Sequence, residues 1–450
     1  MGSYWTSGNG RRVGVAGLGR SGRAAARLLS EKGFIVTGFD DDPSVEECGF
    51  CASHRLGGGD EPLAAVTSLE GLILSPGVPP SSPIPSAARA AGVPVIGEIE
   101  LAWRNAMAPV LAVTGSNGKT TTAEWLGHVL RTAGLKAVVA GNVGYPFSSA
   151  VLDHPDPDWY VVEVSSYQLE TTKDFRPAGA AVLNLTPDHL LRHGSMEKYR
   201  AAKARIFANQ HSEDLAVINM DDPESVPLMG LSRGVECYFS IERQVPSGAD
   251  AAGGAVCMVF DGTRTEVMKA RDLSLPGAHN LANALAVACL ASRAGVPPEA
   301  LAAGLSSFGG VPHRIEKVRT LRGVDWINDS KSTNQDSLRV ALLSFDRPIV
   351  LIAGGLSKKT AYEDLRSLIS GRVKQIVLIG SASAELEEAW RGAAPCLHAG
   401  TMEEAVRICR ETAVEGDIVL LSPACASFDQ YRDFEERGRH FRSLVEAMEP

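Results

Sequence analysis

Short apolar runs alternate along the chain with segments in which apolar residues recur at helical spacing. This alternation is typical of parallel sheets covered by helices, because buried parallel strands are apolar on both faces. The pattern predicts strands at 12–16, 34–39, 72–74, 110–114, 159–164, 180–185, 215–219, 326–329, 348–353, 375–379 and 418–421. It predicts helices at 196–207 and 334–343, and a charged helix at the end of the sequence. The expected fold class is α/β.

Two breaks divide this pattern into three expected domains. A proline-rich stretch at 76–94 precedes the strand at 110–114, and Gly309 and Gly310 mark a turn after the central section. We therefore expect domains at 1–105, 106–310 and 311–450. A chain of 450 residues has room for three domains of ordinary size.

The charge balance narrows the classes of partner. With 44 Lys and Arg against 53 Asp and Glu, the formal net charge is −9 with neutral histidine. We expect no nucleic-acid partner, because such partners favour a basic surface. No run approaches the ~20 apolar residues of a membrane-spanning helix, and residues 1–12 lack the apolar core of a secretory signal. We expect a cytoplasmic protein without a membrane partner.

The eight cysteines are too sparse for a disulfide scaffold. Apolar neighbours around Cys289 and Cys409 predict reduced thiols in the cores. Cys48 and Cys51 form a single CxxC pair that lacks a second pair at zinc-finger spacing, so we expect two surface thiols.

A glycine-rich loop follows the first predicted strand. Gly17, Gly19 and Gly22 spell GxGxxG before an alanine-rich helix, and Asp40 ends the next strand. Glycines at this spacing let backbone N–H groups and a helix N-terminus approach phosphate oxygens. The loop predicts a nucleotide site in a Rossmann-like first domain, although a purely structural tight turn has the same spacing.

A second loop carries the strongest chemical signal. Residues 114–121 read TGSNGKTT between the strand at 110–114 and a helical segment. Successive N–H groups of such a loop wrap phosphate oxygens, the lysine neutralises the terminal phosphates, and a hydroxyl holds Mg²⁺. The spacing departs from the usual template, since Val113 takes the place of the first glycine. We expect a P-loop ATPase-like central domain.

Three further residues of the central section are candidates for this site. Glu163 ends a predicted strand and His189 follows another, where a carboxylate and an imidazole could hold Mg²⁺. Lys203 lies between alanines on the basic helix at 196–207, so it could pack against another element, whereas Lys198 and Arg205 read as solvated.

Polar loops also follow the strands of the last section. They are residues 313–314, 328–334, 354–359 and 422–429. Open α/β sheets bind ligands beyond the carboxyl ends of their strands, so these loops should meet at one edge. Cys425 lies in the last loop, and we expect it to be a buried structural thiol.

Together these motifs resemble the Mur ligases, the ATP-dependent amino-acid-adding enzymes of peptidoglycan synthesis, with a C-terminal Rossmann-like α/β domain. The segments 164–170 (VSSYQLE), 328–334 (NDSKSTN) and 422–430 (SPACASFDQ) are similar to those of the members that add D-glutamate. The resemblance covers nearly the whole chain. It implies ligation of D-glutamate to UDP-N-acetylmuramoyl-L-alanine through an acyl phosphate, with ATP and two Mg²⁺ ions, by a monomer.

The resemblance also implies a role for individual residues. Catalysis would involve Lys119, Lys203 and His189. ATP would meet Gly115, Ser116, Asn117, Gly118, Lys119, Thr120, Thr121, Arg314, Asp329 and Lys331. The UDP substrate would meet Gly17, Gly19, Arg20, Ser21, Gly22, Asp40, Gly77 and Asn142. D-Glutamate would meet Thr333, Lys358, Ser427, Phe428 and Phe434. Magnesium would meet Thr120, Glu163, His189 and Lys203, the last as a carbamate.

Two departures from the family pattern and several alternatives stay open. Residues 356–359 read LSKK, so either Lys358 or Lys359 could meet D-glutamate, and Leu191 stands where an acidic residue is common. A nicotinamide-dependent oxidoreductase would leave the 114–121 loop without a role, and a nucleotide-binding regulator would leave the 422–430 loop without one. Ligases for L-alanine or a diamino acid, and more remotely folylpolyglutamate synthetases, are the related alternatives.

Overall fold

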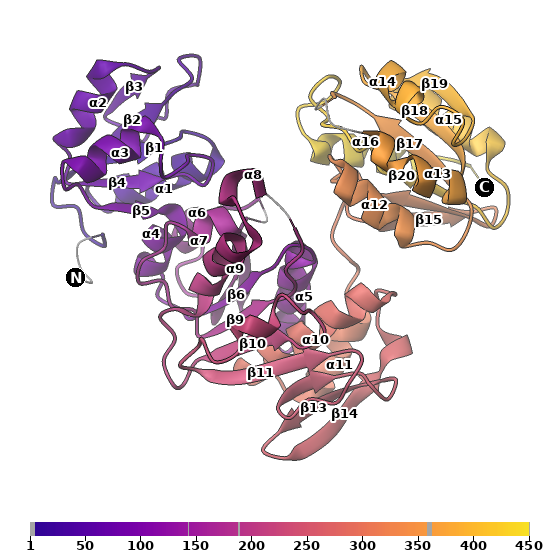
Figure 1. Cartoon of the computed structure of the whole chain (residues 1–450), viewed down its shortest axis with the longest axis horizontal. Helices are drawn as coiled ribbons and strands as arrows, with labels where there is room; N and C mark the ends of the chain where they lie inside the picture. The colour runs from indigo at the N-terminus through magenta and orange to yellow at the C-terminus, as the bar shows by residue number, and fades with distance from the viewer. Residues whose placement is uncertain (1–4, 143, 188–189, 358–361, 450) are drawn as a thin grey trace. The chain divides into compact units, whose positions relative to one another are not determined.

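The computed structural model describes residues 5–142, 144–187, 190–357 and 362–449. The chain forms two compact units, Met1–Gly309 and Gly310–Pro450, which are described separately. In Figure 1 the first unit runs from indigo to salmon and the second from orange to yellow. Both units are α/β, as the sequence predicts.

A five-stranded parallel sheet opens the first unit. Its strands are β1 (Arg12–Ala16), β2 (Ile35–Asp40), β3 (Ser53–Leu56), β4 (Gly71–Leu74) and β5 (Val95–Gly97), in the order β3-β2-β1-β4-β5. Successive strands are therefore added on one side of β1 as far as β3, and then on the other side of β1 from β4 onward. Ligands of doubly wound sheets bind at such a switch point, beyond the carboxyl ends of the strands. The GxGxxG loop follows β1 at this point.

Four helices accompany this sheet. They are α1 (Arg20–Glu31), α2 (Asp60–Thr67), α3 (Pro83–Ala90) and α4 (Glu98–Asn105). The proline-rich stretch thus holds α3 and connects β4 to β5, so it lies within the first sheet's fold and is more than a break between domains. Pro83 and Pro85 lie in the first turn of α3, where a helix needs no N–H donor.

A nine-stranded sheet forms the core of the central section. Its strands are β6 (Val110–Thr114), β7 (Ala137–Gly141), β8 (Trp159–Glu163), β9 (Gly179–Val182), β10 (Leu215–Asn219), β11 (Val235–Ser240), β12 (Gly248–Asp250), β13 (Ala255–Phe260) and β14 (Thr263–Lys269). The order is β14-β13-β12-β11-β10-β9-β6-β8-β7. Every residue of β6 is buried, so this central strand supports the loop that follows it rigidly.

One edge of this sheet is antiparallel, so the expectation of parallel sheets is wrong there. β13 pairs antiparallel with both β12 and β14. The connections at 251–254 and 261–262 are hairpin turns, and they are far too short for the crossover that a parallel pair needs. The exposed polar residues of β14 carried no strand signal in the sequence.

Helices pack on the central sheet and fix its loops. The long helices are α5 (Lys119–Thr132), α10 (Ala278–Arg293) and α11 (Pro298–Ser307), and the shorter ones are α6 (Phe147–Asp153), α7 (Ser166–Leu169), α8 (Leu190–His193) and α9 (Met196–Ala204). The predicted helix at 196–207 ends as an α-helix at Ala204 and continues as a 3₁₀ turn at Arg205–Phe207. Trp125 of α5 stacks on Phe308 and donates a hydrogen bond to the carbonyl of Gly304 in α11.

The second unit is a six-stranded sheet with helices on both faces. Its strands are β15 (Glu316–Leu321), β16 (Val324–Asn328), β17 (Ile349–Gly354), β18 (Val373–Ile379), β19 (Cys396–Gly400) and β20 (Ile418–Leu421), in the order β15-β16-β20-β17-β18-β19. Only the pair of β15 and β16 is antiparallel among the described pairs. One core contains α12 (Gln335–Leu343), α13 (Arg366–Arg372) and α14 (Ser383–Ala389), and the other α15 (Met402–Thr412) and α16 (Phe434–Glu446).

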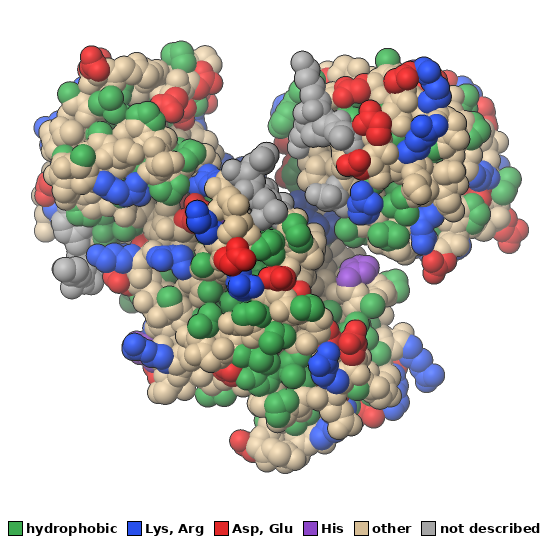
Figure 2. Space-filling model, viewed as in Figure 1, with side chains coloured by type: hydrophobic (Ala, Val, Ile, Leu, Met, Phe, Trp, Pro, Cys, Tyr) green, Lys and Arg blue, Asp and Glu red, His purple; other side chains and the backbone are tan. Residues whose placement is uncertain are grey.

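The cysteines are free thiols. Cys289, Cys409 and Cys425 are buried, as predicted, but the expectation of two surface thiols is wrong for Cys48, which is buried. Apolar packing in the first sheet's core covers Cys48. Among the described residues there is no cluster of three or more potential metal ligands from His, Cys, Asp and Glu, and no helix long and apolar enough to cross a bilayer. Acidic and basic side chains are interspersed over the visible face in Figure 2.

Candidate active site

The loop between β6 and α5 adopts the geometry of a phosphate cradle. Gly118 caps α5 in the left-handed conformation at φ 81°, and Gly115 has φ 156°. A side chain at Gly118 would meet Oδ1 of Asn283 at 2.4 Å, so both the conformation and the space require glycine there. No side chain caps the N-terminus of α5, which leaves its N–H groups available to an anion.

Lys119 begins this helix. Its ammonium donates a hydrogen bond to the carbonyl of Ser116, 2.7 Å away, so the side chain folds back over the loop. A terminal phosphate in the cradle would lie within reach of the same cation. The hydroxyl-bearing Thr120 and Thr121 follow in the first turn and are buried.

The far side of the loop is tied to the end of β9 and to α9. Oγ of Ser116 donates to the carbonyl of Thr186 and accepts from its N–H, both at 2.9 Å. Since the proton of Ser116 is committed, the hydroxyl of Tyr199 donates to Oγ of Ser116 across 2.8 Å. The N–H of Asn117 donates to Oδ1 of Asn184. These contacts hold the cradle in shape.

Lys203 packs against the cradle, the arrangement that its alanine neighbours suggested, and is not a solvated lysine. It is 2% exposed, and its Nζ donates to the carbonyl of Gly115 at 2.9 Å and to Oγ1 of Thr114 at 3.4 Å. It also lies over the ring of Tyr199, one helical turn earlier. Lys198, on the same helix, is exposed as predicted.

Glu163 ends β8 next to the cradle and fits a magnesium ligand. It is 1% exposed, and its Oε1 accepts a hydrogen bond from Nδ2 of Asn142 at 2.8 Å. Within the described part of the chain, its buried Oε2 has no hydrogen-bond partner. A buried carboxylate oxygen without a partner destabilises the fold unless a bound ligand interacts with it. Mg²⁺ prefers oxygen ligands, so it could be that partner.

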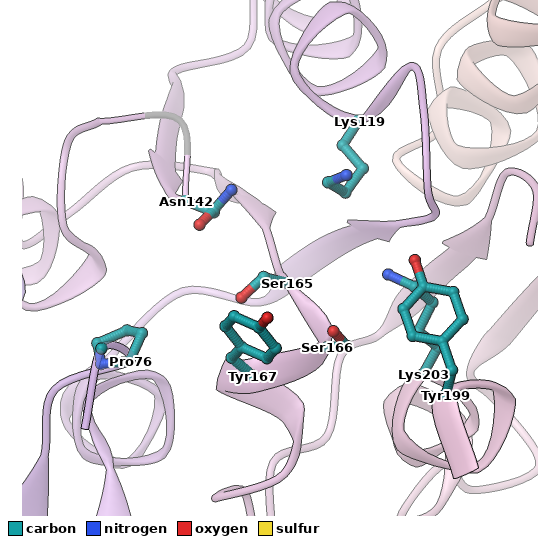
Figure 3. A pocket seen from close by; sticks show the side chains of 9 residues that line it. Pro76, Lys119, Asn142, Ser165, Ser166, Tyr167, Tyr199 and Lys203 are labelled. Atoms are coloured by element: carbon teal, nitrogen blue, oxygen red, sulfur yellow. The ribbon is translucent and has the colours of Figure 1, made fainter. Parts of the chain in front are cut away.

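These side chains line one cavity of about 240 Å³. Figure 3 shows Lys119 on one side of this space, Asn142 on a second and Lys203 with Tyr199 on a third, with Ser165 and Ser166 between them. Its remaining lining residues are Pro76, Gly77 and Tyr167. Residues from the first sheet's loops and the central section therefore enclose a space that has lysines at one end.

A second cavity of about 270 Å³ shares three residues with the first, Pro76, Gly77 and Asn142. Its lining includes four of the residues predicted for the UDP substrate, namely Arg20, Ser21, Gly77 and Asn142. Arg20 donates to the carbonyl of Gly144 at 2.9 Å and so links α1 to the loop after β7.

The GxGxxG loop has the geometry that its spacing predicts. Gly17 has φ 85°, and a side chain at Gly22 would collide with the carbonyl of Gly17. Gly19 precedes α1, whose N-terminus carries no side-chain cap. Asp40 accepts the N–H of Leu18 at 2.7 Å and that of Asp42 at 3.1 Å, so its carboxylate orders the loop.

In the second unit, the loops after β16, β17 and β20 meet at one edge, as predicted. The N–H of Gly354 donates to the carbonyl of Pro423, and Leu356 bridges to Ala426. Asp329 is buried and accepts from Ser422 at 2.9 Å and from the N–H of Ile315. Burial raises the pKa of the Asp329 carboxyl to about 7, although the Ser422 hydrogen bond and the charge of Arg314 lower it.

The other candidates of this unit differ in exposure. Lys331 lies over the ring of Phe434, and Arg314 has a buried Nε without a partner in the described chain. Ser427 is 2% exposed, Thr333 is half-buried and Phe428 is 69% exposed. His189 and Lys358 lie outside the described residues, as does Lys359.

Sequence reasoning missed the residue that joins these loops. Arg437 of α16 is 1% exposed, and its guanidinium donates to the carbonyls of Ser330 and Cys425 and to Oγ of Ser330. Burial lowers its pKa to about 10. The sequence predicts only a charged helix at this position, so the structure alone identifies this arginine as internal.

The lining residues Ser165, Ser166, Tyr167 and Tyr199 were also not predicted as site residues. A local signal exists for Ser165, because Ser165 and Gln168 form a capping box at the start of α7. Tyr199 carried no signal beyond its helical spacing.

Comparisons with known proteins identify the family of the chain. Residues 113–291 match the Mur ligase middle domain, and residues 313–425 match the Mur ligase glutamate ligase domain. Proteins named UDP-N-acetylmuramoylalanine--D-glutamate ligase are similar over nearly the whole chain. The one from Koribacter versatilis is 42% identical, over 98% of both chains. The one from Myxococcus xanthus is 43% identical, over 98% of this chain and 99% of its own.

Solved structures share the fold at low identity. The UDP-N-acetylmuramate-alanine ligase of Thermotoga maritima has a TM-score of 0.59 and 18% identity, over 97% of this chain and 99% of its own. A pseudomurein peptide ligase type C of Methanothermus fervidus has a TM-score of 0.58, also at 18% identity, over 98% and 100%. From the matched domains and the full-length relatives, the chain belongs to the Mur ligase family.

Proposed function

We propose that this chain joins D-glutamate to the alanyl carboxylate of UDP-N-acetylmuramoyl-L-alanine, with ATP as the phosphoryl donor, in peptidoglycan precursor synthesis. The observation that carries the proposal is the cavity that joins the β6–α5 cradle to the loops of the first sheet. The cavity offers lysines to phosphates beside the N-terminus of α5, and Pro76 and Gly77 of the loop after β4 line another part of it. The names of the full-length relatives indicate which amino acid and which acyl substrate are joined.

The cradle residues 115–121 bind the ATP phosphates. Lys119 folds over the loop, where its charge neutralises the negative charge of the transferring phosphoryl group. We also assign Arg314, Asp329 and Lys331 to ATP binding. The residues Thr120 and Glu163 hold Mg²⁺, with His189 as a further ligand. The metal spreads phosphate charge and polarises the γ-phosphoryl group when it is bound.

Lys203 helps to hold Mg²⁺ once its amine has reacted with CO₂. The amine is buried and points at the carbonyl of Gly115, next to the cradle. Burial disfavours a charged amine, and an uncharged amine is the form that captures CO₂. The resulting carbamate replaces a cation that repels Mg²⁺ with an anion that attracts it, and a pair of metal ions can then be held.

The remaining residues position the two organic substrates. Gly17, Gly19, Arg20, Ser21, Gly22 and Gly77 face the uridine diphosphate, with Asp40 ordering their loop, and Asn142 meets the muramoyl side. Thr333, Lys358, Ser427, Phe428 and Phe434 meet D-glutamate. The protein works as a cytoplasmic monomer.

The chemistry requires activation of a carboxylate. Oxide is a poor leaving group, so the γ-phosphoryl group is first moved onto the alanyl carboxylate, and the amine of D-glutamate then displaces phosphate. No protein nucleophile takes part, so the residues act by positioning substrates and by neutralising clustered negative charge.

An omission assay tests the proposal. Purified protein with ATP, Mg²⁺, UDP-N-acetylmuramoyl-L-alanine and D-glutamate should release phosphate continuously, and release should stop when either organic substrate is left out. Phosphate release that is indifferent to D-glutamate contradicts the proposal.

A further inference from the structure

A hydrogen-bonded chain of three side chains ends in the wall of the cavity. Oγ of Ser166, at the start of α7, lies 3.0 Å from Nε2 of His193. Nδ1 of His193 lies 3.2 Å from Oε1 of Glu170, the residue after α7. Ser166 and His193 are 2% and 6% exposed, and Ser166 lines the cavity together with Lys119 and Lys203. None of the three was assigned a role above.

The surroundings of His193 fix how its ring is protonated. The Glu170 carboxylate beside Nδ1 favours the proton there, which leaves Nε2 to accept the hydroxyl proton of Ser166. The rings of Tyr167 and Tyr199 lie 5.6 Å and 5.2 Å from the imidazole and hold its plane. Arg192 of α8 pairs with Oε2 of Glu170 at 2.9 Å and lies over Tyr167. Ser166 therefore presents its oxygen lone pairs, rather than its proton, to a donor in the cavity.

The reaction needs such an acceptor. D-Glutamate arrives with a protonated amine, and the nitrogen must lose protons as it becomes an amide. A hydroxyl, imidazole and carboxylate in this order form the arrangement that moves a proton in acyl-transfer enzymes. Here the order is the same, but the proton comes from the incoming nitrogen.

We propose that Ser166, His193 and Glu170 form the relay that accepts the proton of the attacking amine, an inference that rests on the proposed ligase function. One proton of the ammonium group passes to Oγ of Ser166, while the proton of Ser166 passes to Nε2 of His193, and this frees the lone pair of the nitrogen. The nitrogen then forms a bond to the acyl carbon, and the bond from that carbon to the phosphate oxygen breaks, its electron pair leaving with phosphate. The second proton that the nitrogen loses goes to the departing phosphate. Glu170 stabilises the imidazolium, which then returns its proton to solvent. His193 and Glu170 act through Ser166 as positioning residues.

A reaction with hydroxylamine in place of D-glutamate distinguishes loss of the proton relay from loss of acyl phosphate formation. This nucleophile is uncharged at neutral pH, so it attacks an acyl phosphate without the help of a base and yields a hydroxamate. His193→Gln keeps a hydrogen-bonding group near Ser166 but cannot take up a proton. We expect its rate of amide formation with D-glutamate to fall by about 10²–10⁴-fold, the usual contribution of general base catalysis. Its rate of hydroxamate formation should equal that of the parent.

A second variant and a matched control complete the experiment. Glu170→Gln should lose amide formation selectively as well, which also covers the case in which His193→Gln fails to fold. In both variants the amide rate should recover as pH rises, because the free amine then needs no relay. His211→Gln alters a histidine beside Glu213 where both side chains are exposed, and it should behave like the parent.

The outcomes are distinguishable. Equal loss of amide and hydroxamate in both variants shows that the three residues are only structural, and it overturns the relay while leaving the ligase function intact. A parent protein that forms no hydroxamate with ATP and UDP-N-acetylmuramoyl-L-alanine makes no acyl phosphate, which overturns the proposed function itself and the relay with it.

Discussion

Nζ of Lys203 lies 2.9 Å from the carbonyl oxygen of Gly115, a residue 88 positions earlier in the chain. The contact links α9 to the loop that follows β6. One helical turn earlier, the hydroxyl of Tyr199 forms a hydrogen bond with Ser116 of the same loop. Helix α9 thus holds a candidate phosphate cradle at two adjacent residues. The amine that makes one of these contacts is also the group proposed to react with CO₂.

Replacement of this amine should abolish activity. Lys203→Ala should be nearly inactive, because the carbamate that holds the metal cannot form. A short-chain carboxylic acid added to the variant should restore part of the rate, since it supplies the missing carboxylate in the vacated space. Phosphate release measures both effects, and Lys198→Ala, at an exposed position of the same helix, should match the parent. Full activity of Lys203→Ala in CO₂-depleted buffer would contradict the carbamate.

Removal of the cradle cation should be equally severe. In Lys119→Ala the negative charge on the β- and γ-phosphates is no longer compensated in the transition state. We expect a loss of about 10³–10⁵ in turnover, the range for charge-stabilising residues in phosphoryl transfer. The exposed Lys136→Ala serves as the control. Near-normal turnover of Lys119→Ala would place the ATP site elsewhere.

Oε2 of Glu163 is buried and has no hydrogen-bond partner among the described residues, so we expect a substitution of Glu163 to weaken metal binding. Glu163→Gln can retain the hydrogen bond from Asn142 but places an amide N–H₂ group where the unpartnered Oε2 lies. We expect Mg²⁺ affinity in the presence of ATP to fall at least about tenfold, the lower end for outer-shell partners. Titration calorimetry measures this directly, with the exposed Glu213→Gln as control. Unchanged Mg²⁺ affinity would remove Glu163 from the metal site.

Asp329 predicts a pH dependence of stability. Its folded-state pKa of about 7 lies above its ordinary value of 3.8, so the folded protein binds more protons than the unfolded chain between these values. The free energy of unfolding should therefore decrease as pH rises from about 4 to about 7, because stability falls where the folded state binds the extra proton. Urea denaturation at several pH values should show this slope in the parent and a flatter one in Asp329→Asn. An equal slope in both proteins would assign the effect to other groups.

Sequence reasoning succeeded where the signal is local. The strand β6, its glycine loop and α5 follow one another over residues 110–132, and their apolar run, glycines and helix start all lie in that short stretch. The α/β class followed from the same alternation along the rest of the chain. The strand β14 was missed because its side chains are exposed and polar, so register with β13 rather than hydrophobicity defines it.

The walls of the cavity could not be predicted in the same way. Ser166 and His193 are 27 residues apart and are brought together by the packing of α7, α8 and α9. No periodicity encodes such a contact. Arg437 lies in a helix rich in charge, and its burial depends on carbonyl groups from loops about 12 and 107 residues away. Chemistry that depends on distant pairs becomes visible only in three dimensions.

A substrate panel tests the central claim most directly. The purified chain is incubated with ATP and Mg²⁺, with either UDP-N-acetylmuramate or UDP-N-acetylmuramoyl-L-alanine, and with D-glutamate, L-glutamate, L-alanine or a diamino acid, and products are identified by mass. The account predicts one efficient combination, UDP-N-acetylmuramoyl-L-alanine with D-glutamate, giving the amide and one ADP for each amide formed. Amide formed preferentially from UDP-N-acetylmuramate and L-alanine, or no amide from any pair, would contradict it.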